Sequence, residues 1–275
     1  STQYNNMLAS SRWQDSVMGG TLIADLDLHP QDVLRFSLHY TRDSHSRRDD
    51  AYLPYADSYA YTGSAGAENE WTPLTNLMVV AGVSYDWFQG DQAETLITDD
   101  DGNYVRTQNE KTPDLMDGLN PMIGATYSFA DNTKLFASVA HKTRFPTLMQ
   151  LYHNRRGNPN LKAQKSINYS LGVSRPFGDL AFAEISFFYH DIKDRISSSG
   201  PYDDSLYHNY GHIKLYGFEV GGELRPLDGL ELRAYYTYLK SKDDSDVAVT
   251  DDVIDAPKHK IDASISYTLP KVGTR

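Results

Sequence analysis

The chain has 275 residues, a formal net charge of −11 and no cysteine. The acidic balance argues against nucleic acid as a partner, because phosphate binding needs clustered Lys and Arg. The lack of cysteine excludes disulfides and thiolate metal sites. Mean hydropathy is negative, and no run reaches the roughly 18 apolar residues that a membrane helix needs. Membrane strands stay possible, because they need only about 9–11 residues with every second side chain facing lipid.

Apolar and polar residues alternate with a period of two along most of the chain, the pattern of half-buried β-strands. In 166–174, for example, Ile167, Tyr169, Leu171 and Val173 share one face and alternate with Ser, Asn and Gly. The predicted strands lie, in chain order, near 2–12, 19–28, 33–43, 58–71, 77–88, 119–129, 133–143, 166–174, 180–190, 206–224, 230–238 and 260–269.

Two kinds of connection alternate between these strands. Tight turns rich in Pro, Gly, Asn and Asp are predicted at 29–32, 72–76, 130–132, 175–179 and 225–229. Long polar connections are predicted at 44–57, 89–118, 144–165, 194–205 and 243–257.

This alternation predicts an all-β fold, an antiparallel transmembrane β-barrel with short periplasmic turns and long extracellular loops. A soluble sandwich or propeller is the alternative, but its strands average about 5–6 residues. The 20 Tyr residues also fit a barrel, because aromatic rings gather at both membrane interfaces. The candidates for such girdles near strand ends are Trp87, Phe129, Tyr189, Tyr238 and Tyr267.

The segment 141–173 carries three ordered motifs. Arg144-Phe145-Pro146-Thr147-Leu148-Met149-Gln150-Leu151-Tyr152 is followed by Gly157-Asn158-Pro159-Asn160-Leu161-Lys162, and then by Ser166, Tyr169, Leu171 and Gly172. Their order and spacing resemble the barrel of TonB-dependent outer-membrane receptors. The segment departs from the family pattern at Ala163-Gln164, where Pro-Glu is usual, and at Ser170, where Glu is usual.

Two downstream segments extend the resemblance. Asn209-Tyr210-Gly211 with Gly217-Phe218-Glu219 is similar to one strand of the family, and Pro257-Lys258-His259-Lys260 is similar to another strand opening. We interpret most motif residues as structural, with Gly217 and Glu219 on the inner face of the wall. These structural residues are Pro146, Leu151, Tyr152, Gly157, Asn158, Pro159, Asn160, Leu161, Tyr169, Gly172, Gly217, Glu219, Pro257 and His259.

The resemblance implies uptake of a scarce nutrient chelate, such as siderophore-iron or cobalamin, across the outer membrane of a Gram-negative cell. The implied partners are the metal chelate, the TonB system acting through a plug domain, and outer-membrane lipid and lipopolysaccharide. The resemblance implies a signal segment, a plug domain and a barrel of about 22 strands, so we expect residues 1–275 to be part of a barrel domain, about 12 of those strands, without the plug domain and the C-terminal strands. A complete twelve-strand barrel is the alternative.

Extracellular loops hold the candidate ligand-binding residues. Aromatic rings there could stack on a ligand, and the basic cluster at 142–156 could attract an anionic chelate. The candidates are Tyr52, Tyr55, Tyr104, Arg144, Tyr152, Arg155, Arg156 and Tyr202. Loop solubility and lipopolysaccharide contact are the competing explanation.

Weaker signals concern metals. Asp99, Asp101 and Asn103 present alternating oxygen ligands around Gly102 that suit Ca²⁺, although a plain hairpin tip explains them as well. His208 and His212 would share one face of an extended segment and suit heme or a metal. The acidic run 243–255 could hold divalent cations, but a solvated loop is the simpler interpretation.

The chain carries no Gly-x-Ser-x-Gly, Walker or His-Glu-x-x-His motif, and the sequence points to no cofactor. We therefore predict a transporter and not an enzyme. A passive pore or a surface adhesin is the runner-up. A hydrolase with loop-rim residues such as His153 or His208 is a third hypothesis.

Overall fold

The computed structural model describes residues 11–48, 50–153, 156–198, 206–244 and 257–269. Nearly all of these residues are in β-strands. The elements are β1 (Arg12–His29), β2 (Asp32–Arg48), β3 (Ala56–Leu74), β4 (Leu77–Thr98), β5 (Tyr104–Asn109), β6 (Met116–Ser128), β7 (Lys134–Arg144), α1 (Leu148–Tyr152), β8 (Gln164–Phe177), β9 (Ala181–Lys193), β10 (Ile196–Ser197), β11 (His208–Asn209), β12 (His212–Leu227), β13 (Leu230–Asp243) and β14 (His259–Tyr267).

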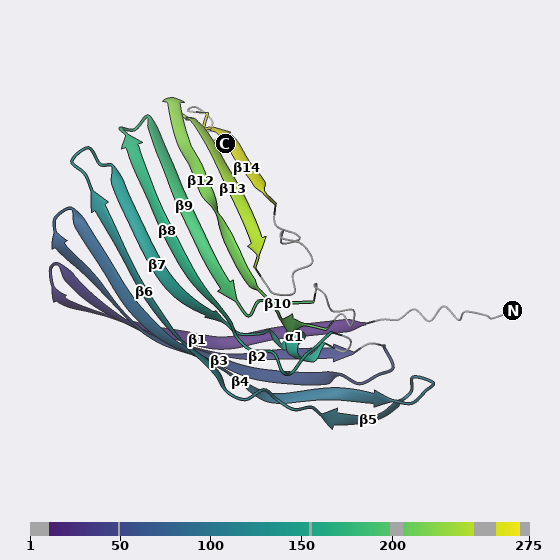
Figure 1. The fold of residues 1–275 in the computed structure, drawn as a ribbon. Coiled ribbons are helices and arrows are strands. Elements are labelled where there is room, and N and C mark those ends of the chain that lie inside the picture. The colour runs from purple at the N-terminus through teal and green to yellow at the C-terminus, as the bar shows by residue number, and fades with distance from the viewer. Residues whose placement is uncertain (1–10, 49, 154–155, 199–205, 245–256, 270–275) are drawn as a thin grey trace.

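One antiparallel sheet of 12 strands forms the molecule. Eleven of them follow the order β1-β2-β3-β4-β6-β7-β8-β9-β12-β13-β14, β5 pairs with β4 alone, and β10 and β11 make a small ladder of their own. Figure 1 shows the sheet as a twisted, curved wall with the tight turns along one end and the long connections, with α1, at the other. In the described part of the chain β1 and β14 each pair with one neighbour, so the wall is an open arc.

The tight turns are confirmed where the sequence predicts them. Gly178 (φ 58°), Gly229 (φ 80°) and Asn132 (φ 64°) take the left-handed conformation that these short connections require. All five turns join neighbouring strands at the same end of the wall.

Several strand boundaries were predicted wrongly. Arg12–His29 is one strand instead of two, and most of the strand expected near 2–12 lies outside the described residues. The stretch 89–109, expected as a loop, continues β4 and folds back as β5. The expected strand 206–224 is divided at Gly211, whose φ of 90° separates β11 from β12.

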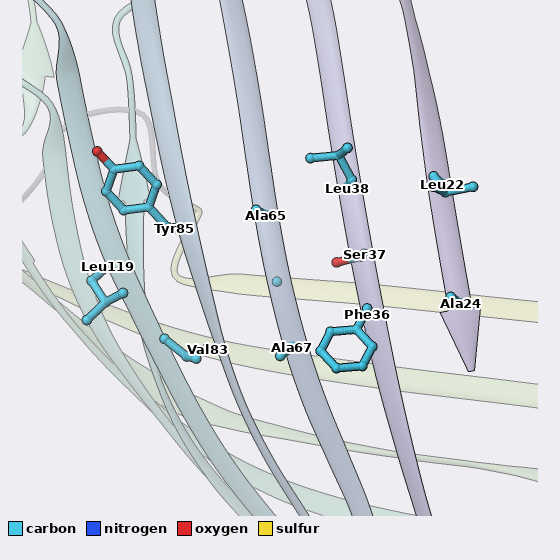
Figure 2. Close-up of a pocket in the computed structure, with 11 residues that line it drawn as sticks. Leu22, Ala24, Phe36, Ser37, Leu38, Ala65, Ala67, Val83, Tyr85 and Leu119 are labelled. Carbon is cyan, nitrogen blue, oxygen red and sulfur yellow. The ribbon is translucent and has the colours of Figure 1, made fainter. Parts of the chain in front are cut away.

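The alternation predicted from the sequence sorts the side chains onto two faces. Leu22, Leu38, Ala65, Tyr85 and Leu119 are register partners on five adjacent strands and form one apolar row. Figure 2 shows this row beside Ala24, Phe36, Ala67 and Val83, which line the same shallow apolar hollow. Leu22 is 68% exposed and Leu119 is 60% exposed. An apolar face this exposed is the one that meets lipid in a membrane barrel. We call it the outer face.

Aromatic rings on the outer face lie toward the loop end of the strands. The ring of Tyr189 lies at a tilt beside those of Tyr169 (6.1 Å) and Tyr216 (6.3 Å), and Tyr238 lies 5.7 Å from Phe218. Trp87 lies 6.0 Å from Tyr85. These rings agree with the predicted girdle.

The buried core of the molecule is small and lies at the loop end, on the inner face. It contains Ala60, Phe88, Ala93, Leu148, Leu151, Tyr152, Leu161 and Ile196. In the part that the structure describes, no helix has the length and apolar character to cross a membrane.

Candidate functional site at the loop end

The β7–β8 connection folds back over the inner face of the wall. Its helix α1 begins at Thr147, whose Oγ1 accepts a hydrogen bond from Gln150 N (3.2 Å) while Gln150 Oε1 accepts one from Thr147 N (3.0 Å). This reciprocal cap satisfies two donors at the helix start. Leu148, Leu151 and Tyr152 then face the same side and are buried. The helix was not predicted, because five residues are too few for a helical period to show.

The Gly157-Asn158-Pro159-Asn160 segment closes this connection as a turn. Asn158 Oδ1 accepts from Asn160 N (3.0 Å), and Asn158 N donates to the carbonyl of Gln150 at the end of α1 (2.9 Å). A Cβ at Gly157 would overlap the backbone of His153 and Leu151. The turn also places Leu161 in the core, where it is 3% exposed.

A second asparagine joins this connection to the next one. Asn209 Oδ1 accepts from Lys162 N (2.6 Å), and Asn209 Nδ2 donates to the carbonyls of Lys162 (2.9 Å) and Asp194 (2.8 Å). Asn158 Nδ2 likewise donates to Tyr207 O (2.8 Å). We call the described residues of 146–163, with β10 and β11, the loop core.

The loop core packs against distant strands. Phe145 stacks on Phe88 of β4 at 5.9 Å, and His153 meets the ring of Trp13 in β1 at 5.9 Å. Leu151 and Pro146 are among the largest fully buried side chains of the described residues. These residues therefore pack the loop end.

The remaining motif residues lie in the sheet. Gly172 faces the ring of Phe136, and a Cβ at Gly217 would overlap the carbonyl oxygen of Tyr238. Glu219 Oε1 accepts from Thr237 Oγ1 (3.4 Å). Glu219 alternates with Phe218 of the outer face, so it lies on the inner face, as expected.

Two other motif residues have different positions. His259 Nδ1 hydrogen bonds to the hydroxyl of Tyr236 (2.7 Å) on the outer face, and Pro257 is exposed just before β14.

A polar network across neighbouring strands was missed by the sequence reasoning. Asp86 accepts from Ser64 Oγ (2.5 Å) and from Asn120 Nδ2 (2.5 Å), and Asn120 Oδ1 accepts from Thr143 Oγ1 (2.9 Å). It crosses four strands, from β3 to β7. The only sequence signal was the run of polar residues at alternate positions, which gives a face and no partners.

The candidate ligand-binding residues are spread over separate loops. Tyr52 (95% exposed) and Tyr55 (37%) share the β2–β3 connection, and Tyr104 (45%) is on β5. Arg144 is the last residue of β7 and Arg156 lies on the β7–β8 connection, and both are exposed. No hydrogen bond or ring contact joins any two of these described side chains. Arg155 and Tyr202 lie outside the described residues.

Tyr152 differs from the other candidates because its ring is 3% exposed. Its hydroxyl is buried with no hydrogen-bond partner among the described residues, and burial raises the pKa of this phenol. Tyr152 is therefore placed for packing and not for stacking on a ligand.

The candidate metal residues at 99–103 lie at the tip of the β4–β5 hairpin. Asp99 Oδ1 accepts from Asp101 N (3.1 Å) and Asn103 N (2.7 Å), so the carboxylate closes its own hairpin tip. Hydrogen bonds from the backbone and side chain of Asn103 also lower the pKa of Asp99. No group of three or more His, Asp or Glu suited to a metal occurs in the described ranges.

The histidine pair was predicted wrongly as one extended segment. The break at Gly211 places His208 in β11 and His212 in β12, where His212 Nε2 contacts Asp191 Oδ1 (2.5 Å). Most of the acidic run 243–255 lies outside the described residues.

Comparison with known proteins agrees with the wall and its loop end. Two curated relatives cover part of the chain. One is the iron-regulated outer membrane virulence protein of Vibrio cholerae (28% identical over 127 residues, 42% of this chain and 20% of that protein). The other is the ferric-pyoverdine M114 receptor PbuA of Pseudomonas sp. strain M114 (26% over 212 residues, 73% and 24%). The chain thus spans at most about a quarter of the length of these relatives.

Solved structures share the fold. The copper transporter OprC superposes with a TM-score of 0.73 at 18% identity, over 94% of this chain and 42% of that one. The ferric yersiniabactin uptake receptor FyuA of Yersinia pestis gives 0.65 at 21%, over 94% and 40%. The names of these two neighbours are those of a transporter and an uptake receptor. Residues 1–274 match the family described as TonB dependent receptor-like, beta-barrel. The chain therefore belongs to the TonB-dependent receptor β-barrel family of the outer membrane.

Proposed function

We propose that this chain is part of the wall of a receptor that imports a ferric chelate, with a siderophore as the first candidate. The family match over residues 1–274 carries the proposal. The names of the two curated relatives favour iron, since one is iron-regulated and the other is a ferric-pyoverdine receptor. Copper is the second candidate, because OprC has the same fold.

The geometry supports a receptor in one further respect. The periplasmic end holds only tight turns, whereas the loop end is long, packed and rich in exposed Tyr and Arg side chains. Such a surface suits capture of a bulky ligand from outside. We further propose that the whole protein contains a plug domain inside the wall, and that TonB acts through that domain.

Uptake by living cells tests this function. A strain lacking the gene is grown under iron limitation with ferric pyoverdine, ferric yersiniabactin or free ferric citrate as the iron source, and uptake of radioactive iron is measured. We expect the deletion strain to lose uptake of one chelate. A strain that lacks TonB should show the same loss. Unchanged uptake of every chelate, with loss of copper accumulation instead, would favour the second candidate.

The exposed arginines provide a sharper test. In the full-length protein, replacing Arg144 and Arg156 by Ala should slow association of an anionic ferric chelate by about tenfold at low salt, because charged rims steer ligands electrostatically. The difference should shrink at high ionic strength. Arg106→Ala on β5 is the matched control, since its guanidinium already contacts Gln108 (3.3 Å). Equal rates for all three proteins would remove the arginines from the capture surface.

A further inference from the structure

A group of lysines lies on the outer face directly beyond the tyrosine row of β8, β9 and β12. Tyr169, Tyr189 and Tyr216 are register partners, and the row continues to Lys240 in β13. Lys240 Nζ lies 5.9 Å from the ring of Tyr216, which places both on the same face. The next rows toward the loops hold the other members of the group.

Those rows follow from the strand register. The first row lies two residues beyond the tyrosines and contains the register partners Asp191, Lys214 and Lys242. The second row lies four residues beyond the tyrosines, where Lys165 pairs with Lys193. Because side chains alternate along a strand, all of these point to the outer face. We call Lys165, Lys193, Lys214, Lys240 and Lys242 the lysine patch.

The patch lies at the height of the lipid headgroups. Tyrosine rows mark the membrane interface in barrels. The two lysine rows follow at about 7 and 13 Å along the strands, at about 3.3 Å per residue. The lysines are on the loop side, so they face the outer leaflet. Their aliphatic stems can lie along the tyrosine rings while the ammonium groups reach the headgroups.

The two cross-strand lysine pairs differ in how their repulsion is relieved. Lys214 and Lys242 are opposite each other, and Asp244 bridges them, with Oδ1 2.6 Å from Lys242 Nζ and Oδ2 in contact with Lys214 Nζ. Lys165 and Lys193 are also opposite each other. Like charges in this position destabilise a sheet.

Among the residues that the structure describes, no carboxylate bridges Lys165 and Lys193. The carboxylate of Asp191, in the neighbouring row, contacts His212 instead (2.5 Å). Asp114, Asp117 and Asp194 border the same hollow as Lys165 without an ion pair to it in the described part of the chain. The pair therefore lacks the anion that its equivalent in the next row has.

We propose that the lysine patch binds the phosphate groups of lipid A, the phosphorylated lipid anchor of lipopolysaccharide in the outer leaflet. The unbridged pair would hold one phosphate between Lys165 and Lys193, and Lys240 would approach the headgroup from above Tyr216. The adjoining rings and Ile167 offer apolar surface to the acyl chains. The proposal needs the outer-membrane position of the wall and does not depend on which chelate is imported.

Binding of lipid A to the full-length, delipidated protein in detergent tests the site by native mass spectrometry. Lipid A with two phosphates is titrated against the wild type and against Lys165→Gln/Lys193→Gln/Lys240→Gln. We expect the triple variant to bind at least about tenfold more weakly, since each lysine near an anionic surface contributes measurably. Lys→Arg at the same three positions should keep the affinity.

Controls separate the patch from charge in general. Arg106→Gln/Lys134→Gln/Lys260→Gln removes the same charge elsewhere and should bind like the wild type. Migration on unheated gels reports whether each variant is folded. The proposal is overturned if the folded triple variant binds as the wild type does, if dephosphorylated lipid A binds equally well, or if inorganic phosphate binds as tightly as lipid A.

Discussion

Asn158 uses both ends of its side chain within the loop core, accepting from Asn160 N and donating to Tyr207 O. Asn158→Ala should therefore destabilise this region by about 1–2 kcal/mol, since each hydrogen bond contributes about 0.5–1.5 kcal/mol. Limited proteolysis measures this loss of stability as faster cleavage of the loop end. Asn160→Ala is the control, because the exposed Asn160 bonds through its backbone alone, and its cleavage rate should not change.

Gly217 has no space for a side chain, since a Cβ would overlap the carbonyl of Tyr238 on the neighbouring strand. Gly217→Ala must push β12 and β13 apart, so we expect a smaller folded fraction on unheated gels. At Gly20 an added Cβ meets nothing within 4 Å. If Gly20→Ala lowered the folded fraction as much as Gly217→Ala does, close strand approach would not be the cause.

Asp244 connects two lysines at the end of the sheet. Hydrogen bonds from Lys214 and Lys242 lower its pKa to about 2. A lowered carboxyl pKa means that the contact is present above the unfolded value of 3.8 and is lost as pH falls through about 2. The same contact raises the pKa of Lys214.

Amine labelling at neutral pH measures this coupling. Asp244→Asn should return the pKa of Lys214 toward its ordinary value and increase its acetylation, as measured by mass spectrometry. Lys240 has no ion pair within the described residues and should be labelled equally in both proteins. An unchanged Lys214 rate would show that the bridge does not form in solution.

Helix α1 packs against the core with one side, and the N-cap Thr147 stabilises its first turn. Thr147→Ala removes the cap, which typically costs about 1 kcal/mol. Because α1 carries Leu148 and Leu151 into the core, the loss should increase proteolysis of the loop end. Thr147→Ser keeps the hydroxyl and should restore the wild-type rate, whereas a loss equal to that of Ala would show that the cap is not what matters.

Strand lengths show where sequence reasoning stops at the scale of elements. Between Leu77 and Phe88 one face of β4 meets lipid, so apolar and polar residues alternate along the strand. This part of β4 was predicted. Beyond Gln89 apolar and polar residues do not alternate, so the sequence did not distinguish strand from loop and the hairpin with β5 was missed. Gly211 gave no signal of its own, because the break depends on Asn209 bonding across to Lys162 and Asp194.

The two faces of the wall are the property that the sequence predicted best for the whole molecule. Leu38 lies in a lipid-facing row, and Ser37, its neighbour in β2, is on the opposite face because side chains alternate along a strand. Leu38→Arg should destabilise the folded barrel by about 2–4 kcal/mol in liposomes, the cost of Arg near the bilayer midplane. Ser37→Arg adds the same charge on the other side and should cost much less. Equal losses in folded fraction would mean that the faces are assigned wrongly.

The ligand surface could not be predicted to the same depth. Tyr55 and Arg144 were found as exposed loop residues, but they come from connections far apart in the sequence, and a period-two pattern carries no information about how loops meet. Tyr152 illustrates the limit: its type suggested a ring that stacks on a ligand, whereas its place on the packed side of α1 buries it.

The connection between β7 and β8 is anchored on strands that do not carry it. Through Phe145 on Phe88 and His153 on Trp13, it is held by β4 and β1. These contacts join the connection to strands that are not neighbours of β7 or β8 in the sheet. A force applied to the β7–β8 connection would be resisted by β1 and β4. A ligand that displaced this connection would therefore transmit force across the wall.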